Sequence, residues 1–304
     1  MIPFRPLTVQ DKLLVERYVF PSEMRICDLG FVNLISWQFL YDTEIAVYKD
    51  FLLFRFYTDG HLAYLFPVGN GNYKEVVEAM MEDANALGHA FLMLGVCEAD
   101  FAKLDASMPE HFYRTSDRCY FEYIYLRQSL ATLSGKKMQA KRNYVNRFIN
   151  QYPNYAFKHL TPDMFAKCLE LDRYWMQSKR FETIEEEKES ANERVALENA
   201  FRYWTSLNAR GGALYVGNEI VAFTYGSPIN HDTFDVCVEK ANTQYEGVFQ
   251  MVNREFVRSL PEQYIHVNRE EDMCISGLRS SKLSYHPELL LGKYAVMTKH
   301  PLGK

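Results

Sequence analysis

The sequence predicts an α/β fold made of two similar units in tandem, each a mixed sheet flanked by helices. Two stretches, residues 45–96 and 213–267, repeat one order of elements: a hairpin, a helix and a further strand. The chain has 304 residues, of which 48% are hydrophobic, and this is enough for two cores, since domains commonly contain about 100–150 residues. We therefore expect one domain at 1–130 and a second at 131–304.

The first unit begins with two apolar, aromatic strands between Ile45 and Val68, separated by Asp59-Gly60. Asp-Gly between such strands is a strong signal for a two-residue hairpin. Apolar residues then recur at helical spacing from Tyr73 to Leu87, which predicts an amphipathic helix. A strand from Ala90 to Val96 completes the unit.

Helical patterns occupy the middle of the chain. One runs from Ser134 to Tyr152, with apolar residues on one face, and Pro153 ends it. A second runs from Pro162 to Ser178. The acidic run from Ile184 to Glu193 is interpreted as a solvated helix face or a mobile loop, because like charges at this density favour solvent.

The second unit repeats the first. Two strands around Gly217-Asn218 are followed by a strand at Thr233–Val238, a helix at Val248–Leu260 and a strand at Tyr264–Val267. The densest charge in the chain follows that last strand. Because unpaired buried charges are strongly disfavoured, we expect a site there.

Composition narrows the classes of function. The net charge of −5 does not favour broad binding to polyanions, so a nucleic acid or lipid contact needs a local patch. No apolar window approaches the ~18 residues of a membrane span, and the amino terminus lacks the apolar core of a signal peptide, so we expect a cytoplasmic protein.

The six cysteines lack zinc-ligand spacing, which predicts reduced thiols and no metal site. HExxH, GxSxG, GxGxxG and the Walker phosphate loop are all missing.

Three segments, Gly135–Phe148, Val238–Phe256 and Asn268–Tyr294, resemble the C-terminal domain of phosphatidylglycerol lysyltransferases and related uncharacterised proteins. The resemblance covers most of residues 130–304 and, more loosely, the first half. It implies two GNAT-like (acetyltransferase-like) domains in tandem, with a site where two central strands splay apart. Transfer of an acyl or aminoacyl group to an amine or hydroxyl is the implied activity. The donor would be a CoA thioester or aminoacyl-tRNA, with no tightly bound cofactor.

Two segments are candidates for binding the donor's phosphates. Lys137 and Lys141 are four residues apart on the predicted helix, beside Arg142, so a phosphate could lie between them. This basic helix, residues 136–147, could also contact a tRNA. The alternative is that its basic side chains face solvent and bind no ligand.

The other candidate is the segment before the Val248 helix, which resembles the Q/R-x-x-G-x-G/A loop of CoA-dependent acetyltransferases. Free N–H groups at a helix start bind pyrophosphate. The segment departs from the pattern at its last position, and Gly247 could instead be an ordinary helix-entry residue. The candidate residues are Gln244, Glu246, Gly247, Val248 and Phe249.

The charged segment near the carboxyl end supplies groups for proton transfer and acceptor binding. The predicted catalytic residues are Glu239, Glu271, Asp272 and Tyr285. The predicted acceptor-binding residues are Asn268, Arg269, Arg279, Lys282 and His286. Glu239, Gln244, Gly247, Asn268 and Asp272 are expected at the same end of the sheet. The alternative is a structural ion-pair network in which Asp272 or Glu271 pairs with Arg269 or Arg279.

Three functions remain open at this point. The leading hypothesis is an acyltransferase of the aminoacyl-transferring kind. The second is an acyl-CoA-dependent N-acyltransferase. The third is a binding protein whose GNAT-like site no longer catalyses a reaction but still holds an anionic ligand. Fold resemblance alone does not decide among them, and the oligomeric state is not predicted.

Overall fold

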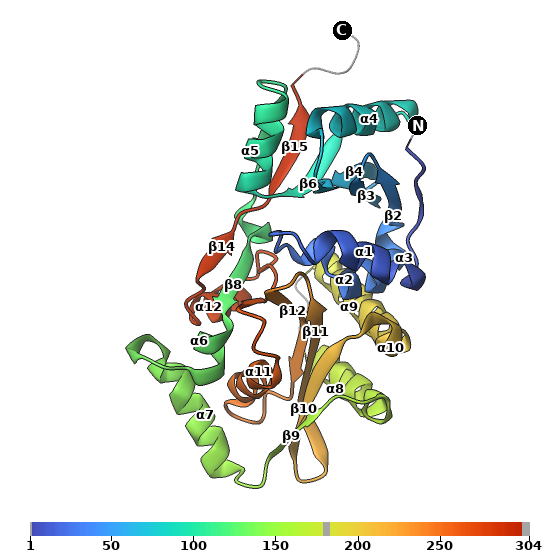
Figure 1. The fold of residues 1–304 in the computed structure, drawn as a ribbon. Helices are drawn as coiled ribbons and strands as arrows, with labels where there is room; N and C mark the ends of the chain where they lie inside the picture. Colours follow the sequence, from blue (N-terminus) through green and yellow to red (C-terminus); the bar gives the residue numbers. More distant parts are fainter. Residues whose placement is uncertain (1, 179–182, 300–304) are drawn as a thin grey trace.

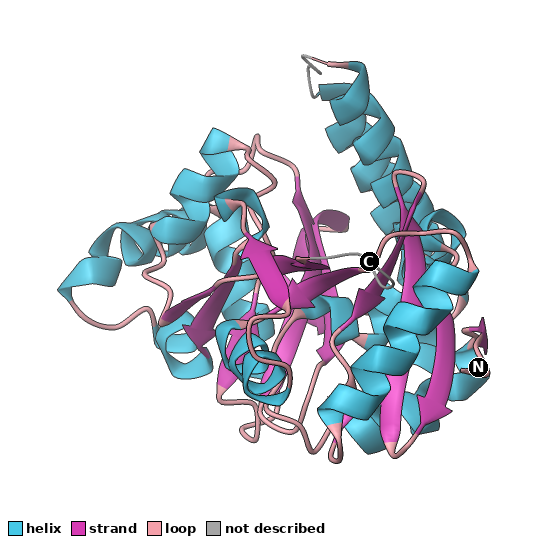
Figure 2. Cartoon of the chain, turned by 90° about the horizontal axis from the view of Figure 1, so that it is seen from above, coloured by secondary structure: helices cyan, strands magenta, loops and turns pink. Residues whose placement is uncertain are grey.

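A computed structural model describes residues 2–178 and 183–299 of the chain. Two mixed sheets lie one beyond the other along the molecule, with helices around them (Figures 1 and 2). This confirms the predicted α/β class. None of the helices within the described ranges is long and apolar enough to cross a lipid bilayer.

The first sheet contains eight strands in the order β1-β2-β3-β4-β6-β15-β7, with β5 paired to β3. The strands are β1 (Arg5–Pro6), β2 (Glu44–Tyr48), β3 (Phe51–Thr58), β4 (His61–Leu65), β5 (Val68–Gly69), β6 (Leu92–Val96), β7 (Phe112–Thr115) and β15 (Tyr294–Thr298). The predicted hairpin is the β3–β4 turn, where Asp59 and Gly60 both have positive φ. Helix α4 (Tyr73–Ala86) packs its buried Val76 and Met80 into the core of this sheet.

The second sheet contains seven strands in the order β14-β8-β13-β12-β11-β10-β9. They are β8 (Glu122–Leu126), β9 (Ala156–His159), β10 (Arg210–Val216), β11 (Glu219–Pro228), β12 (Thr233–Ala241), β13 (His266–Asn268) and β14 (Leu289–Leu291). Only β12 and β13 pair in parallel, so this sheet is mixed, as predicted.

Helices cover both faces of the second sheet (Figure 1). On one face lie α6 (Arg127–Thr132), α7 (Gln139–Gln151) and α11 (Val248–Ser259), whose apolar residues share a core with the sheet. On the other face lie α2 (Phe31–Ser36), α8 (Phe165–Ser178) and α9 (Ile184–Arg202). The acidic run is therefore helical, being the first half of α9.

The remaining helices are short. They are α1 (Lys12–Val19), α3 (Gln38–Tyr41), α5 (Glu98–Ser107), α10 (Trp204–Leu207) and α12 (Ser276–Leu283). Three-residue 3-10 turns include η2 (Cys27–Leu29), η3 (Arg118–Tyr120) and η4 (Lys136–Met138). The helix predicted from Ser134 thus begins with η4, and its α-helical part starts at Gln139.

The two sheets exchange strands. β8, from the first half of the chain, lies between β13 and β14 of the second sheet. β15, near the carboxyl end, lies between β6 and β7 of the first sheet, where Figure 1 shows it beside α5. A boundary near residue 130 remains a prediction, and cutting the chain there would separate each sheet from one of its interior strands, β15 or β8.

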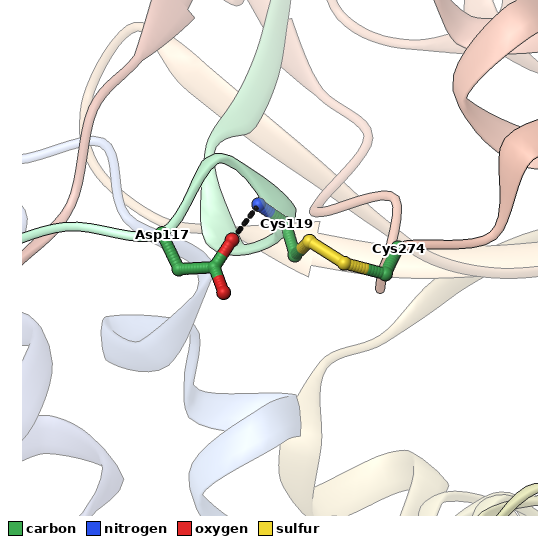
Figure 3. A group of neighbouring side chains, drawn as sticks. All are labelled: Asp117, Cys119 and Cys274. Atoms are coloured by element: carbon green, nitrogen blue, oxygen red, sulfur yellow. Dashed lines mark hydrogen bonds between the residues drawn. A yellow bond between two sulfur atoms is a disulfide. The ribbon is translucent and has the colours of Figure 1, made fainter.

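The prediction that all six cysteines are reduced is wrong for two of them. Cys119 and Cys274, 155 residues apart, form a disulfide (Figure 3). Cys27, Cys97, Cys168 and Cys237 are free. Sequence spacing could not reveal the bridge, because the two half-cystines meet only when η3 and the segment after β13 come together.

Candidate functional site

Strands β12 and β13 pair over only three residues each, and the last pair is Asp235 with Asn268. Beyond this pair β12 continues to Ala241, whereas β13 ends. The strands therefore separate here, as expected at the site of a GNAT-like domain. Polar side chains gather on both faces of the sheet at this point.

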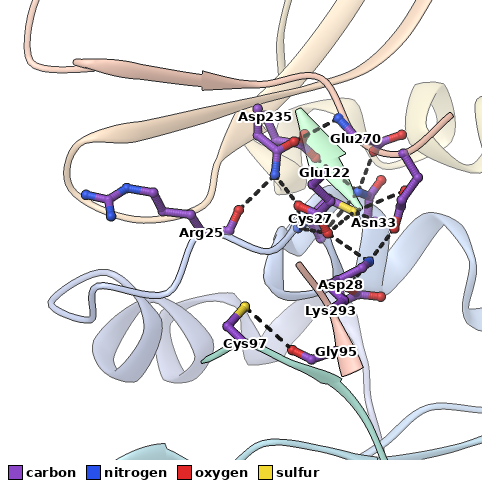
Figure 4. Close-up of polar contacts among 12 residues, drawn as sticks. Arg25, Cys27, Asp28, Asn33, Gly95, Cys97, Glu122, Asp235, Glu270 and Lys293 are labelled. Atoms are coloured by element: carbon purple, nitrogen blue, oxygen red, sulfur yellow. Dashed lines mark hydrogen bonds and ion pairs between the residues drawn. The ribbon is translucent and has the colours of Figure 1, made fainter. Parts of the chain in front are cut away.

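The face toward α2 carries a group of five carboxylic acids, which we call the acidic centre (Figure 4). Its members come from η2, β8, β12 and the segment after β13. They are Asp28, Glu122, Asp235, Glu270 and Glu271. Segments far apart in the sequence therefore supply one polar cluster between the two sheets.

Lys293 is the ammonium that ion-pairs with this centre. Its Nζ lies 2.8 Å from both Asp28 and Glu122 and is also paired with Glu271. Burial alone would lower the pKa of Lys293, but the adjacent carboxylates raise it. Its ammonium occupies the place that a bound cation would take among Cys27, Asp28, Glu122 and Glu271.

Glu122 is fully buried and is held by several donors. The backbone N–H of Cys27 donates to both of its oxygens at 3.2 and 3.0 Å, and the Asn268 amide donates to Oε2. Burial and the nearby Glu271 outweigh the effect of Lys293 and raise the pKa of Glu122 to about 7. Glu122 can therefore gain or lose a proton near neutral pH.

Asp235 and Glu270 form the other half of the centre. The Asn33 amide nitrogen donates to Asp235 Oδ2 at 3.0 Å and to Glu270 Oε1 at 2.9 Å. Burial, followed by neighbouring carboxylates, raises the pKa of both acids. Asp235 is fully buried, and its carboxyl group is hydrogen-bonded to that of Glu270, although no described N–H or hydroxyl group donates to its Oδ1.

The face toward α11 carries the second group, which we call the Lys141–Arg269 cluster. Arg269 pairs with Glu239 at 3.1 Å, and Asn253 of α11 donates to the other Glu239 oxygen, also at 3.1 Å. The Arg269 guanidinium lies 5.0 Å from the Tyr285 ring centre. Lys141 Nζ lies 4.0 Å from the centre of the same ring.

Lys141 points inward, toward Tyr285, although it belongs to the predicted basic helix. Only 9% of its surface is exposed. Burial, together with the Arg269 charge, lowers the pKa of Lys141 to about 8. Lys137 is exposed in η4, so the two lysines do not present one surface to a phosphate. Arg142 donates to the carbonyl oxygens of Leu133 and Gly135 instead.

Asp272 belongs to a third group of hydrogen-bonded and ion-paired side chains. Arg279 binds its two oxygens at 2.8 Å each, Arg118 lies at 3.2 Å, and the Tyr123 hydroxyl donates at 2.6 Å. The Arg279 hydrogen bonds lower the pKa of Asp272 to about 2. Asp272 is wholly buried beside the Cys119–Cys274 bridge, and this geometry favours the ion-pair alternative for Asp272 and Arg279.

The segment from Gln244 to Phe249 packs against α7. Gly247 has φ +81°, and a Cβ at this position would lie 2.4 Å from the Tyr144 carbonyl oxygen, so only glycine fits. Glu246 pairs with Arg147 at 2.6 Å, and Gln244 donates to the Tyr174 hydroxyl. Val248 is buried, whereas Phe249 lies at the edge of the core. The helix-entry interpretation therefore explains Gly247 without a ligand.

The five residues expected at one end of the sheet contact different groups of side chains. Asn268 supports the acidic centre, Glu239 lies on the opposite face, and Asp272 lies in the ion-pair group. Lys282 is buried and donates to the carbonyl oxygens of Arg269 and Glu271, so it holds the backbone of this segment. His286 is exposed at a turn with φ +52°. Roles for all these residues remain predictions.

Sequence reasoning missed Asp28, Glu122, Asp235 and Lys293. Three of them had a signal: each is a lone charge inside an apolar run, namely FEYIYL, TFDVCV and LLLGKYAV. A charge in a buried strand needs a partner, and the partners in this case come from distant parts of the chain. Asp28, in a short turn, had no comparable signal.

The chain matches the family described as phosphatidylglycerol lysyltransferase, C-terminal, over residues 21–297. It is similar to a conserved protein of unknown function from Bacteroides thetaiotaomicron, with 49% identity and a TM-score of 0.95 over 98% of this chain and 100% of that one. An uncharacterised protein of Mycoplasmoides gallisepticum is 27% identical over 179 residues, 57% of this chain and 55% of that protein. The chain therefore matches about half the length of that relative.

The fold is also that of L-PGS from Bacillus licheniformis, with a TM-score of 0.69 at 18% identity over 97% of this chain and 93% of that one. A tandem GNAT protein from the clavulanic acid biosynthesis pathway gives a TM-score of 0.50 at 10% identity, with 99% of each chain covered. The tandem GNAT architecture predicted from the sequence is confirmed. The chain belongs to the phosphatidylglycerol lysyltransferase C-terminal family.

Proposed function

We propose that this protein transfers an aminoacyl group from an activated ester, with aminoacyl-tRNA as the donor class, to an amine or hydroxyl acceptor. The observation that carries the proposal is the acidic centre, a group of five carboxyl groups of which Lys293 ion-pairs with three. An aminoacyl group has an ammonium next to the reacting carbonyl, whereas an acetyl group has no positive charge. A buried site rich in carboxylates can bind the ammonium of an aminoacyl group, whereas an acetyl group has no charge for it to bind.

The charge balance supports an ammonium ligand. Five carboxyl groups lie in the centre, and Lys293 ion-pairs with three of them. Lys282, whose charge acts on Glu270, donates its hydrogen bonds to backbone carbonyl oxygens. Burial and the neighbouring carboxylates raise the pKa values of Glu122, Asp235 and Glu270, which favours protons that reduce the negative charge of the centre. A bound ammonium would replace those protons, since an opposite charge nearby favours the ionised carboxylate.

In the proposed reaction, the acceptor nitrogen or oxygen attacks the ester carbonyl carbon, and the bond from that carbon to the ribose oxygen breaks. One proton leaves the acceptor and one reaches the ribose hydroxyl, so the transfer is balanced. Asp235 and Glu270 would hold the ammonium. Glu271, with 15% of its side chain exposed, would take the acceptor's proton, and Glu122 across Lys293 could store it.

A CoA donor fits less well. The segment that would cradle its pyrophosphate has its central glycine packed on the α7 backbone at Tyr144, and Glu246 adds a negative charge beside it. Phe249 stands where the acetyltransferase pattern has a small residue. An aminoacyl ester does not need that loop. These observations favour the aminoacyl donor over the acyl-CoA alternative.

Binding of small donor fragments tests the proposal. We expect L-alanine amide and L-leucine amide to bind in calorimetric titrations, while their N-acetyl forms, which carry no ammonium, and acetyl-CoA do not. Asp235→Asn and Glu270→Gln should each weaken amide binding by about tenfold or more, the effect of a lost charge-assisted hydrogen bond. Glu262→Gln, an exposed acid, is the control. Preference for acetyl-CoA, or equal binding of the N-acetyl forms, would reject an ammonium site.

Catalysis needs its own measurement. With aminoacyl-tRNA and hydroxylamine as the acceptor, we expect protein-dependent formation of the aminoacyl hydroxamate. Amide binding without hydroxamate formation would instead support the third hypothesis, a binding protein.

Proton release on binding is a further test. Calorimetric titrations in buffers of different ionisation enthalpy should show proton release on amide binding, because the ammonium displaces protons from the acidic centre.

A further inference from the structure

The Cys119–Cys274 bridge ties together two segments that supply the acidic centre. Cys119 in η3 lies three residues before Glu122, and Cys274 lies three residues after Glu271. Figure 3 shows the bridge crossing from η3 to the segment after β13. Glu122 and Glu271 both pair with Lys293, so their relative position depends in part on this bond.

The backbone around Cys274 has a conformation that needs such a tie. Met273 and Cys274 are consecutive residues with φ of +49° and +60°, and Glu270 has φ +55°. Residues other than glycine seldom adopt this left-handed conformation, because their Cβ atoms crowd the backbone. Beside the bridge, the Met273 N–H donates to the Cys119 carbonyl oxygen at 3.2 Å. Opening the bridge would therefore let residues 270–274 relax away from η3.

The two sulfur atoms differ in access and in their electrostatic surroundings. Cys274 is exposed, whereas Cys119 is buried. Arg279 Nη2 lies 3.6 Å from Cys119 Sγ. Arg279 and Arg118 share one carboxylate, that of Asp272, so these surroundings keep a positive charge. A positive charge stabilises a thiolate, and a stabilised thiolate leaves faster in thiol–disulfide exchange. A thiol can therefore approach Cys274, and Cys119 is the better leaving group.

We propose that the Cys119–Cys274 bridge is a thiol–disulfide exchange site that switches the acidic centre between a closed, ligand-binding form and an open form. The thiolate of a dithiol attacks Cys274 Sγ, and the electron pair of the S–S bond leaves with Cys119 Sγ beside Arg279. The second thiol of the dithiol then attacks the mixed disulfide and releases the Cys274 thiolate. The bridge gains two electrons, the dithiol becomes a disulfide, and its two protons pass to the two cysteines.

Only the effect of the switch on ligand binding rests on the proposed aminoacyl transfer. Cys27 offers a readout that needs no ligand. Its thiol is buried in the acidic centre, 3.3 Å from Glu122 Oε1 and 3.8 Å from both Glu271 carboxylate oxygens. If the segment after β13 moves away from η3, this thiol becomes accessible to reagents.

Alkylation by iodoacetamide, followed by peptide mass spectrometry, measures that opening. In a Cys119→Ser, Cys274→Ser double variant, Cys27 should be labelled about tenfold or more faster than in the oxidised parent. Cys168 is the matched control, because its thiol is also free and buried but lies in the apolar core on α8. An unchanged rate at Cys27 would overturn the switch. An equal rise at Cys27 and Cys168 would overturn it too, because that result marks general destabilisation.

The point of attack can be located with excess glutathione, acid quenching and peptide mass spectrometry. We expect glutathione bound to Cys274, with Cys119 as the free thiol, because the exposed sulfur is attacked and the buried one leaves. Glutathione found mainly on Cys119 would overturn this assignment. A bridge that resists excess glutathione until the protein unfolds would do the same.

Ligand binding tests the functional consequence. We expect L-alanine amide to bind the oxidised parent more tightly than the parent reduced with dithiothreitol, by about tenfold or more. The double variant should bind it equally with and without reductant. Equal binding by the oxidised and reduced parent would show that the bridge does not control the acidic centre. If neither form binds the amide, the proposed aminoacyl site is wrong, and the Cys27 labelling rates still decide whether the switch exists.

Discussion

Replacing Asp272 by asparagine separates a structural role of this residue from a catalytic one. The carboxylate is wholly buried and has Arg279, Arg118 and Tyr123 as partners. Asparagine keeps the shape and can still accept from the Cys274 N–H, as Oδ1 does at 3.0 Å. It removes the negative charge on which both arginines depend.

The pKa of Asp272 gives the size of the effect. A fall from 3.8 to about 2 corresponds to about 2.4 kcal/mol. The two arginines are one-third exposed, with 34% and 33% of their side chains accessible, so solvent screening reduces this to about 1–2 kcal/mol. Because the folded-state pKa is depressed, this stability is present above pH 4 and is lost as the pH falls toward 2.

Urea unfolding of the oxidised protein is the assay. At pH 7, Asp272→Asn should lose about 1–2 kcal/mol of unfolding free energy, and the deficit should shrink at pH 3. Asp59→Asn, in an exposed hairpin turn, should show no deficit. If Asp272→Asn is as stable as the parent at pH 7 but no longer forms the aminoacyl hydroxamate, the scaffold interpretation is wrong and the predicted catalytic role stands.

Three further changes have expected outcomes. Burial lowers the pKa of Lys141 from 10.5 to about 8, so Lys141→Met should raise the free energy of unfolding at pH 7 by about 1–2 kcal/mol after solvent screening. This gain should fade as the pH rises from 8 to 10.5, and urea unfolding at pH 7 and pH 10 measures it. Gly247→Ala should destabilise the protein by at least about 2 kcal/mol, seen as a lower Tm, because its Cβ would meet the Tyr144 carbonyl oxygen at 2.4 Å; an unchanged Tm would contradict the packing. Reduction of Cys119–Cys274 should cost about 2–5 kcal/mol, and a Cys119→Ser, Cys274→Ser double variant should melt at the same lower temperature with or without reductant.

Much of the local structure could be predicted from the sequence. Asp59-Gly60 requires two residues with positive φ, and the apolar spacing from Tyr73 specifies one helix face, so β3, β4 and α4 lie where predicted. The strand before the charged segment begins two residues later than expected, at His266. These features depend on neighbours in the chain, which the sequence records directly.

The exchange of strands could not be predicted in this way. β8 and β15 are ordinary apolar strands, and nothing in their residues says which sheet they complete. The choice depends on which edges remain open after the other strands have paired. It determines the acidic centre, because β8 carries Glu122 into the second sheet and Lys293 immediately precedes β15.

The faces of β12 show most clearly what tertiary structure decided. Asp235 and Glu239 are four residues apart and should share a face in a regular strand, yet Asp235 contacts Asn33 of α2 and Glu239 contacts Asn253 of α11. The register shifts between Tyr225 and Gly226, which leaves one extra residue in β12 and reverses the alternation. The sequence determined that Asp235 lies within a predicted strand and that Glu239 directly follows it. The bulge, which forms only in the paired sheet, placed them in two separate groups of polar side chains on opposite faces of the sheet.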